Sequence, residues 1–159
     1  MHQTTSITVT LPSDLEIVLT RTFNSPRALV FKAHSSCDHV SRWWGQAGST
    51  LSLCEMDFRT GGTWRFVEHD AAGDDHGFRG EFREIVQGEK IVQTFEYEGL
   101  PGHISVETLL FADEGSKTRL TSTSLFASVE DRDGMLQSGM ETGANESWNR
   151  LAEYAESLS

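Results

Sequence analysis

The sequence predicts an α+β domain in which a curved antiparallel sheet is covered by one long C-terminal helix, with two short helices near the N-terminus. Apolar and polar residues alternate over 15–23 and again through most of 51–126, which is the period of strands with one buried face. Tight-turn residues separate these segments, a pattern that favours hairpins over βαβ units. After residue 128 the period changes to that of an amphipathic helix.

Composition restricts the classes of partner. The 159 residues suit one domain, and we expect an N-terminal extension over 1–13 and a single domain over 14–159. The formal charge of −11 argues against binding to nucleic acid or to an anionic membrane surface. No apolar run approaches the ~20 residues of a spanning helix, and no secretory signal is visible, so we expect a cytoplasmic protein.

The first strand, over 15–23, is followed by signals for two short helices. Ser25 is a suitable N-cap for a helix that has Pro26 at its first position, where the missing N–H costs nothing. This helix is expected to end near Ala33. A second short helical turn is expected after Ser36.

The middle of the chain predicts a run of hairpins. Gly61-Gly62 forms a tight reversal because glycine tolerates positive φ, and residues 70–76 form a polar hairpin tip. The expected strands are 51–59, 63–69, 77–86, 90–96, 104–112 and 118–126.

The C-terminal segment predicts a short helix from residue 129 and a long helix over 140–158. Ser128 with Asp131 resembles a capping box, and Ser138 with Glu141 is a full one. The expected inward positions of the long helix are Met140, Ala144, Ser147, Leu151, Tyr154 and Leu158.

Small residues dominate the first half of that inward stripe. Gly143 in mid-helix costs about 1 kcal/mol relative to alanine, so its small size has a reason. Either the helix packs closely against the sheet here, or an unfilled space lies between them. We favour the space.

Several short strings occur in the order and spacing of a known family. They are Ser25-Pro26-Arg27, Arg42-Trp43-Trp44-Gly45, Cys54-Glu55-Met56-Asp57-Phe58-Arg59, Gly61-Gly62, Arg79-Gly80, Thr118-Arg119-Leu120-Thr121 and Gly139-Met140-Glu141. Through them, over about residues 14–158, the chain resembles the bacterial branch of the activator of heat-shock protein 90 ATPase homologue-like family, in the SRPBCC (START/Bet v-like) superfamily.

The resemblance implies a helix-grip fold with a cavity under the long helix. It also implies a range of functions, because superfamily members bind lipids, steroids or polyketides, some cyclise polyketides, and eukaryotic relatives assist a chaperone. Two departures from the family pattern concern the cavity. Ala144 stands where a large aromatic residue is common, and Ser122 and Ser124 stand where apolar residues are commoner.

Metal binding is the first chemistry to consider. His69 and His76 flank Asp70, Asp74 and Asp75 on one hairpin tip, which supplies possible ligand types without the spacing typical of a zinc site. A solvated loop is the interpretation that we favour. We therefore expect no metal and no cofactor.

Nucleophilic catalysis has no clear signature. Cys37 begins a short helix, where the helix dipole could lower its pKa, but we favour a structural or exposed thiol. Cys54 shares its strand phase with apolar neighbours and is expected in the core. His34 shows no spacing that suggests a partner.

Glu107 is the one candidate for acid–base chemistry. It is in phase with Leu109 on the strand over 104–112, so it either faces the cavity, where burial would raise its pKa, or belongs to a solvated face. We favour the solvated face, and we interpret Glu68 and Glu84 as surface residues also.

The leading hypothesis is a binding module for a small hydrophobic molecule. The rival hypotheses are an enzyme of the polyketide cyclase, dehydratase or hydrolase type with Glu107 as its weak catalytic candidate, and a chaperone-binding partner protein. A homodimer is a further expectation left open. The candidate ligand-binding residues are Trp44, Trp64, Phe66, Phe82, Glu107, Ser122, Ser124, Met140, Ala144 and Ser147.

Overall fold

The computed structural model describes residues 7–158, and within them eight strands form one antiparallel sheet accompanied by four helices. The strands are β1 (Thr8–Thr10), β2 (Glu16–Phe23), β3 (Thr50–Met56), β4 (Thr63–His69), β5 (Asp75–Val86), β6 (Lys90–Tyr97), β7 (Ile104–Glu114) and β8 (Lys117–Leu125), and the helices are α1 (Arg27–Lys32), α2 (Cys37–Val40), α3 (Val129–Gln137) and α4 (Met140–Ser157).

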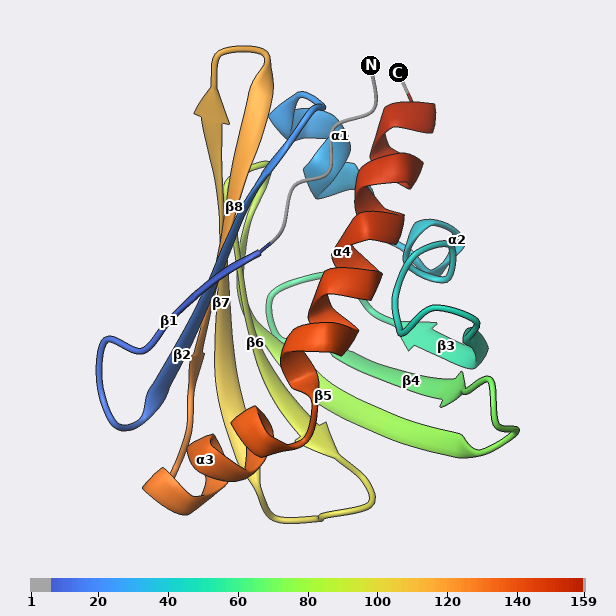
Figure 1. The fold of residues 1–159 in the computed structure, drawn as a ribbon. Helices are drawn as coiled ribbons and strands as arrows, with labels where there is room; N and C mark the ends of the chain where they lie inside the picture. Colours follow the sequence, from blue (N-terminus) through green and yellow to red (C-terminus); the bar gives the residue numbers. More distant parts are fainter. Residues whose placement is uncertain (1–6, 159) are drawn as a thin grey trace.

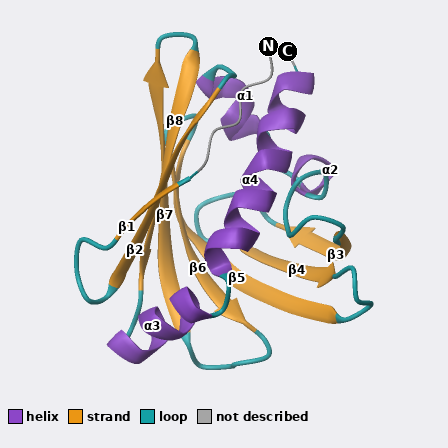
Figure 2. Cartoon of the chain, in the orientation of Figure 1, coloured by secondary structure: helices purple, strands orange, loops and turns teal. Residues whose placement is uncertain are grey.

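The sheet curves strongly, and the long helix α4 lies along its concave face (Figures 1 and 2). The strand order is β1-β2-β8-β7-β6-β5-β4-β3. The predicted α+β helix-grip architecture is confirmed.

Strand β1 was not anticipated, because it falls in the segment expected to be an extension. It pairs antiparallel with β2, and Thr8 lies opposite Thr20. Residues 1–6 of the expected extension lie outside the described residues. On its other side β2 pairs with β8, so the second and the last strands of the chain are neighbours in the sheet.

The start of α1 differs from the prediction. Its N-cap is Pro26, and no side chain caps the helix. Ser25 is instead buried, and its carbonyl oxygen accepts a hydrogen bond from Oγ1 of Thr118 at 2.7 Å. The residue that was expected to cap the helix therefore joins it to β8.

The two C-terminal helices begin differently from one another. The Ser128 hydroxyl accepts a hydrogen bond from the backbone N–H of Asp131 at 3.1 Å, as the capping-box pattern predicted. The second capping box is wrong, because Gly139, with φ of 83°, is the N-cap of α4. The Ser138 hydroxyl donates to the Met135 carbonyl instead.

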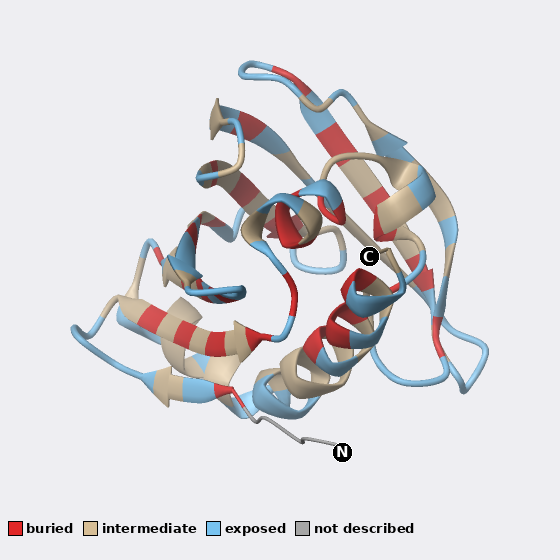
Figure 3. Cartoon of the chain, turned by 90° about the horizontal axis from the view of Figure 1, so that it is seen from above, coloured by how far each residue is buried: buried red, intermediate tan, exposed pale blue. Residues whose placement is uncertain are grey.

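The core lies between α4 and the concave face of the sheet. Buried positions alternate along the strands and gather on the sheet-facing side of α4 (Figure 3). Leu151 is fully buried as predicted, and Trp148, which is not among the predicted inward positions, is buried too and packs edge-on against Phe23. Within residues 7–158 no helix is long and apolar enough to cross a bilayer.

The two cysteines are bonded to each other, which corrects the expectation of two separate thiols. Cys37 begins α2 and Cys54 lies in β3, and their Cα atoms are 5.8 Å apart. Strand β3 is at the edge of the sheet, so the disulfide fastens this edge to the helix beside it.

Candidate functional site

A cavity of about 320 Å³ lies between α4 and the concave face of the sheet. Its volume is at the lower end of the range typical of small-molecule sites. The structure places all ten candidate ligand-binding residues around this one cavity: Trp44, Trp64, Phe66, Phe82, Glu107, Ser122, Ser124, Met140, Ala144 and Ser147.

Aromatic side chains form one wall. The centroid of the Trp44 ring lies 5.3 Å from that of the Phe66 ring and 5.1 Å from that of the Phe78 ring, and both contacts are edge-on. Phe78 in turn lies 5.5 Å from Phe95. Phe78 and Phe95 are not among the predicted ligand-binding residues, although Phe78 shares the strand phase of Phe82 and could have been found from it.

Gly80 makes room for one of these aromatic residues. A Cβ atom at Gly80 would lie 2.6 Å from Nε1 of Trp64 and would also overlap the carbonyl oxygen of Thr94. The indole therefore lies over the glycine. Trp64 is buried, and its Nε1–H has no hydrogen-bond partner among the residues that the structure describes.

The loop after α2 forms part of the cavity lining and is fastened on two sides. The N–H of Gly45, which has φ of 109°, donates to the Ser147 hydroxyl on α4 at 3.1 Å. The N–H of Gln46 donates to Oε2 of Glu68 on β4 at 2.9 Å. Glu68 is thus buried at the cavity, and its interpretation as a surface residue was wrong. Glu84 is exposed, as predicted.

Glu107 faces the cavity, so the favoured interpretation of a solvated face was wrong. Leu109, in phase with Glu107 on β7, is buried, whereas Leu110 is 45% exposed. The carboxylate Oε1 accepts a hydrogen bond of 2.9 Å from Nε2 of Gln93, its register partner on β6. Loss of hydration raises the pKa of Glu107, and the hydrogen bond from Gln93 opposes this shift only in part.

His34 lines the cavity as well and was missed because its sequence neighbours give no sign of it. Its Nδ1 lies 2.8 Å from the carbonyl oxygen of Val30, which can only accept, so Nδ1 carries the proton. Its ring packs 4.8 Å from Trp43 and 5.2 Å from Phe111. Burial lowers the pKa of His34 to about 4, and the ring is therefore neutral at pH 7 with Nε2 as an acceptor.

The histidines of the β4–β5 hairpin tip pair with neighbouring carboxylates. His69 lies 2.8 Å from Asp75, and His76 lies 2.8 Å from Asp70. Two hydrogen bonds lower the pKa of Asp70, and the one from the Asp74 N–H has a larger effect than the one from His76. Across residues 7–158 no three His, Cys, Asp or Glu side chains are grouped so as to hold a metal ion.

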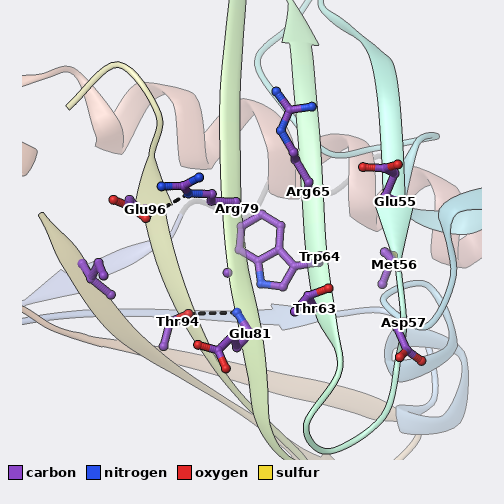
Figure 4. A pocket seen from close by; sticks show the side chains of 12 residues that line it. Glu55, Met56, Asp57, Thr63, Trp64, Arg65, Arg79, Glu81, Thr94 and Glu96 are labelled. Carbon is purple, nitrogen blue, oxygen red and sulfur yellow. Dashed lines mark hydrogen bonds and ion pairs between the residues drawn. The ribbon is translucent and has the colours of Figure 1, made fainter. Parts of the chain in front are cut away.

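A second hollow, of about 730 Å³, lies on the face of the sheet opposite α4 (Figure 4). It is larger than the cavity, and both arginines that line it are held in ion pairs. Arg79 lies 3.0 Å from Glu96, and Arg65 lies 2.7 Å from Glu98. Because these arginines are already paired with carboxylates, the cavity between α4 and the sheet is the stronger candidate site.

Comparisons with known proteins agree with this architecture. The family model described as Activator of Hsp90 ATPase homolog 1-like protein matches residues 24–156. No curated protein matches the chain at significant similarity.

Solved bacterial structures match closely in shape. A protein from Rhodobacter sphaeroides superposes with a TM-score of 0.88 at 20% identity, covering 96% of this chain and 100% of that one. A protein from Nitrosomonas europaea has a TM-score of 0.83 at 19% identity, with coverage of 93% and 98%. A protein from Silicibacter pomeroyi described as AHSA1 has a TM-score of 0.76 at 19% identity, with coverage of 91% and 99%. At these identities the likeness establishes the fold and no activity.

Proposed function

Since the chain belongs to the Activator of Hsp90 ATPase homolog 1-like family, whose helix-grip fold it shares, we propose that it binds a small, largely apolar molecule between α4 and the sheet. The observation that carries this proposal is the composition of the cavity. Aromatic and aliphatic side chains form most of its lining, and a few polar side chains interrupt them. Such a lining is typical of small-molecule sites, where apolar contact supplies affinity and polar groups fix orientation.

A thermal-shift screen of lipids, sterols and aromatic polyketide-like compounds tests the proposal. A ligand that binds only the folded chain, at about 100 times its Kd, raises the Tm by about 5–10 °C for a domain of this size. The decisive comparison is between Ala144→Trp, which fills the cavity, and Ala72→Trp, which makes the same change on an exposed turn. The first variant is expected to lose the shift and the second to keep it. No shift with any compound would count against the proposal.

A second candidate function is an enzyme that acts on the same ligand with Glu107 as general base. The observation that favours it is the inward carboxylate with its raised pKa and its Gln93 partner. Once a ligand is known, Glu107→Gln separates the two functions. Turnover that disappears in this variant while binding persists identifies an enzyme, whereas binding without turnover in either protein identifies a binding module.

A further inference from the structure

The charges around the cavity are of one sign. Its titratable lining residues are His34, Glu68 and Glu107, and no Lys or Arg lines it within the described part of the chain. The inward-facing Arg21 is not among the lining residues. Its guanidinium donates to Oδ1 of Asn149 at 2.6 Å and lies 5.0 Å over the Phe23 ring.

A buried anionic ligand would therefore find no cation to pair with. Removing an anion from water costs several kcal/mol unless a charge partner or several hydrogen bonds replace its hydration. In this cavity a ligand carboxylate would lie among acidic side chains. The overall charge of −11 disfavours its approach also.

The polar groups that line the cavity suit an uncharged ligand instead. Gln93 and Glu107 form a hydrogen-bonded pair, and the hydroxyl-bearing Ser124 is the register partner of Glu107 on β8. The Glu107 carboxyl group, whose pKa is raised by burial, donates one hydrogen bond when it is protonated. A ligand carbonyl oxygen can accept this hydrogen bond without bringing a charge into the site.

We propose that the cavity takes an uncharged aromatic or aliphatic molecule whose carbonyl or hydroxyl group lies against the Gln93–Glu107 pair, and that it rejects carboxylates of the same skeleton. This inference rests on the proposed function, because it names the class of molecule that the cavity holds. According to this inference, the cavity discriminates among ligands mainly by their charge.

Three compounds with one ring system test the inference: acetylnaphthalene, naphthoate and naphthylmethylammonium. Each is titrated near neutral pH against protein loaded with the uncharged fluorophore N-phenylnaphthylamine, and displacement is measured. The ketone is expected to bind at least roughly tenfold more tightly than the carboxylate, because the carboxylate would lose its hydration in a cavity that offers no Lys or Arg to pair with it. Equal or tighter binding of naphthoate, or tightest binding of the ammonium compound, would overturn the inference.

Two variants locate the effect. Glu107→Gln keeps a hydrogen-bond donor and removes the acidic group. It is therefore expected to preserve the affinity for acetylnaphthalene and to reduce the ratio of that affinity to the affinity for naphthoate. Glu81→Gln makes the same chemical change at an exposed position on the opposite face of the sheet, and it is expected to leave this affinity ratio unchanged. If the affinity ratio is the same in Glu107→Gln as in the wild type, the Gln93–Glu107 pair is not what selects against carboxylates. If the fluorophore itself fails to bind, the proposed function fails, which is distinguishable from a wrong order among the three compounds.

Discussion

The disulfide between Cys37 and Cys54 joins the short helix α2 to the edge strand β3, and the chain that it encloses carries Trp44 and Gly45 to the cavity. A cross-link between residues 17 apart removes conformations from the unfolded chain. It also holds the loop after α2 against the edge of the sheet. Stability and the shape of the cavity are therefore connected through this bond.

The first prediction concerns that bond. The double variant Cys37→Ser/Cys54→Ser is expected to lower the free energy of unfolding by about 3 kcal/mol, the value typical of a loop of this length. Urea denaturation with and without a thiol reductant measures it. The reductant should bring the wild type to the stability of the variant and leave the variant unchanged. Equal stability of the two proteins without reductant would contradict the prediction.

The second prediction concerns Glu107. Its pKa in the folded chain is raised above the ordinary 4.5, so the folded state holds a proton that the unfolded state releases. Its contribution to stability is therefore present below pH 4.5 and is lost as the pH rises through the folded pKa. Glu107→Gln cannot ionise, so its stability relative to wild type should increase over that range. Urea unfolding measures the free energy of unfolding of both proteins, with Glu81→Gln as control. A difference between Glu107→Gln and the wild type that does not change with pH would refute the prediction.

The third prediction concerns His34, whose effect has the opposite direction. The pKa of His34 falls from 6.5 to about 4 on folding, so its contribution is complete above pH 6.5 and is lost as the pH falls to about 4. The shift corresponds to about 3 kcal/mol. His34→Gln keeps a donor for the Val30 carbonyl but does not titrate here. The variant should lose less stability than wild type between these pH values, and equal losses would be the contrary result.

The fourth prediction concerns Gly80. Gly80→Ala forces its Cβ against the Thr94 carbonyl and the Trp64 indole, so it should cost about 1–3 kcal/mol of unfolding free energy and weaken ligand binding. Gly134→Ala is the matched control, because its Cβ would meet nothing within 4 Å. In mid-helix it should stabilise the chain by up to about 1 kcal/mol. Thermal unfolding of both variants measures these opposite effects on stability. A Gly80→Ala variant as stable as the wild type would contradict the prediction.

Local patterns predicted the hairpins and the long helix because each depends on neighbouring residues. Alternation along β4 and the Gly61-Gly62 turn before it are examples, and β4 begins and ends where the pattern predicted. The facing of β7 could not be predicted in this way. Ile104 and Leu110 on its outer face are as apolar as Leu109 on its inner face, so composition does not identify the buried side.

Tertiary contacts account for the other differences. Cys37 and Cys54 meet only because α2 lies beside the edge strand, and nothing in their spacing indicates it. His34 reaches the cavity through the position of α1 against β7. The candidate ligand-binding residues were easier to select, because the small residues of the long helix and the family resemblance both indicated a cavity. The periods of the strands and of the helix then indicated most of the residues that face it.

The most direct test of the central claim is a titration of N-phenylnaphthylamine that follows the tryptophan emission of the protein. Trp44 and Trp64 line the cavity, so a bound fluorophore should quench them with saturation at one equivalent. The account predicts this result for the wild type and for Ala72→Trp, and its loss in Ala144→Trp. Quenching that persists unchanged in Ala144→Trp, or no saturable quenching in the wild type, would contradict a ligand-binding cavity between α4 and the sheet.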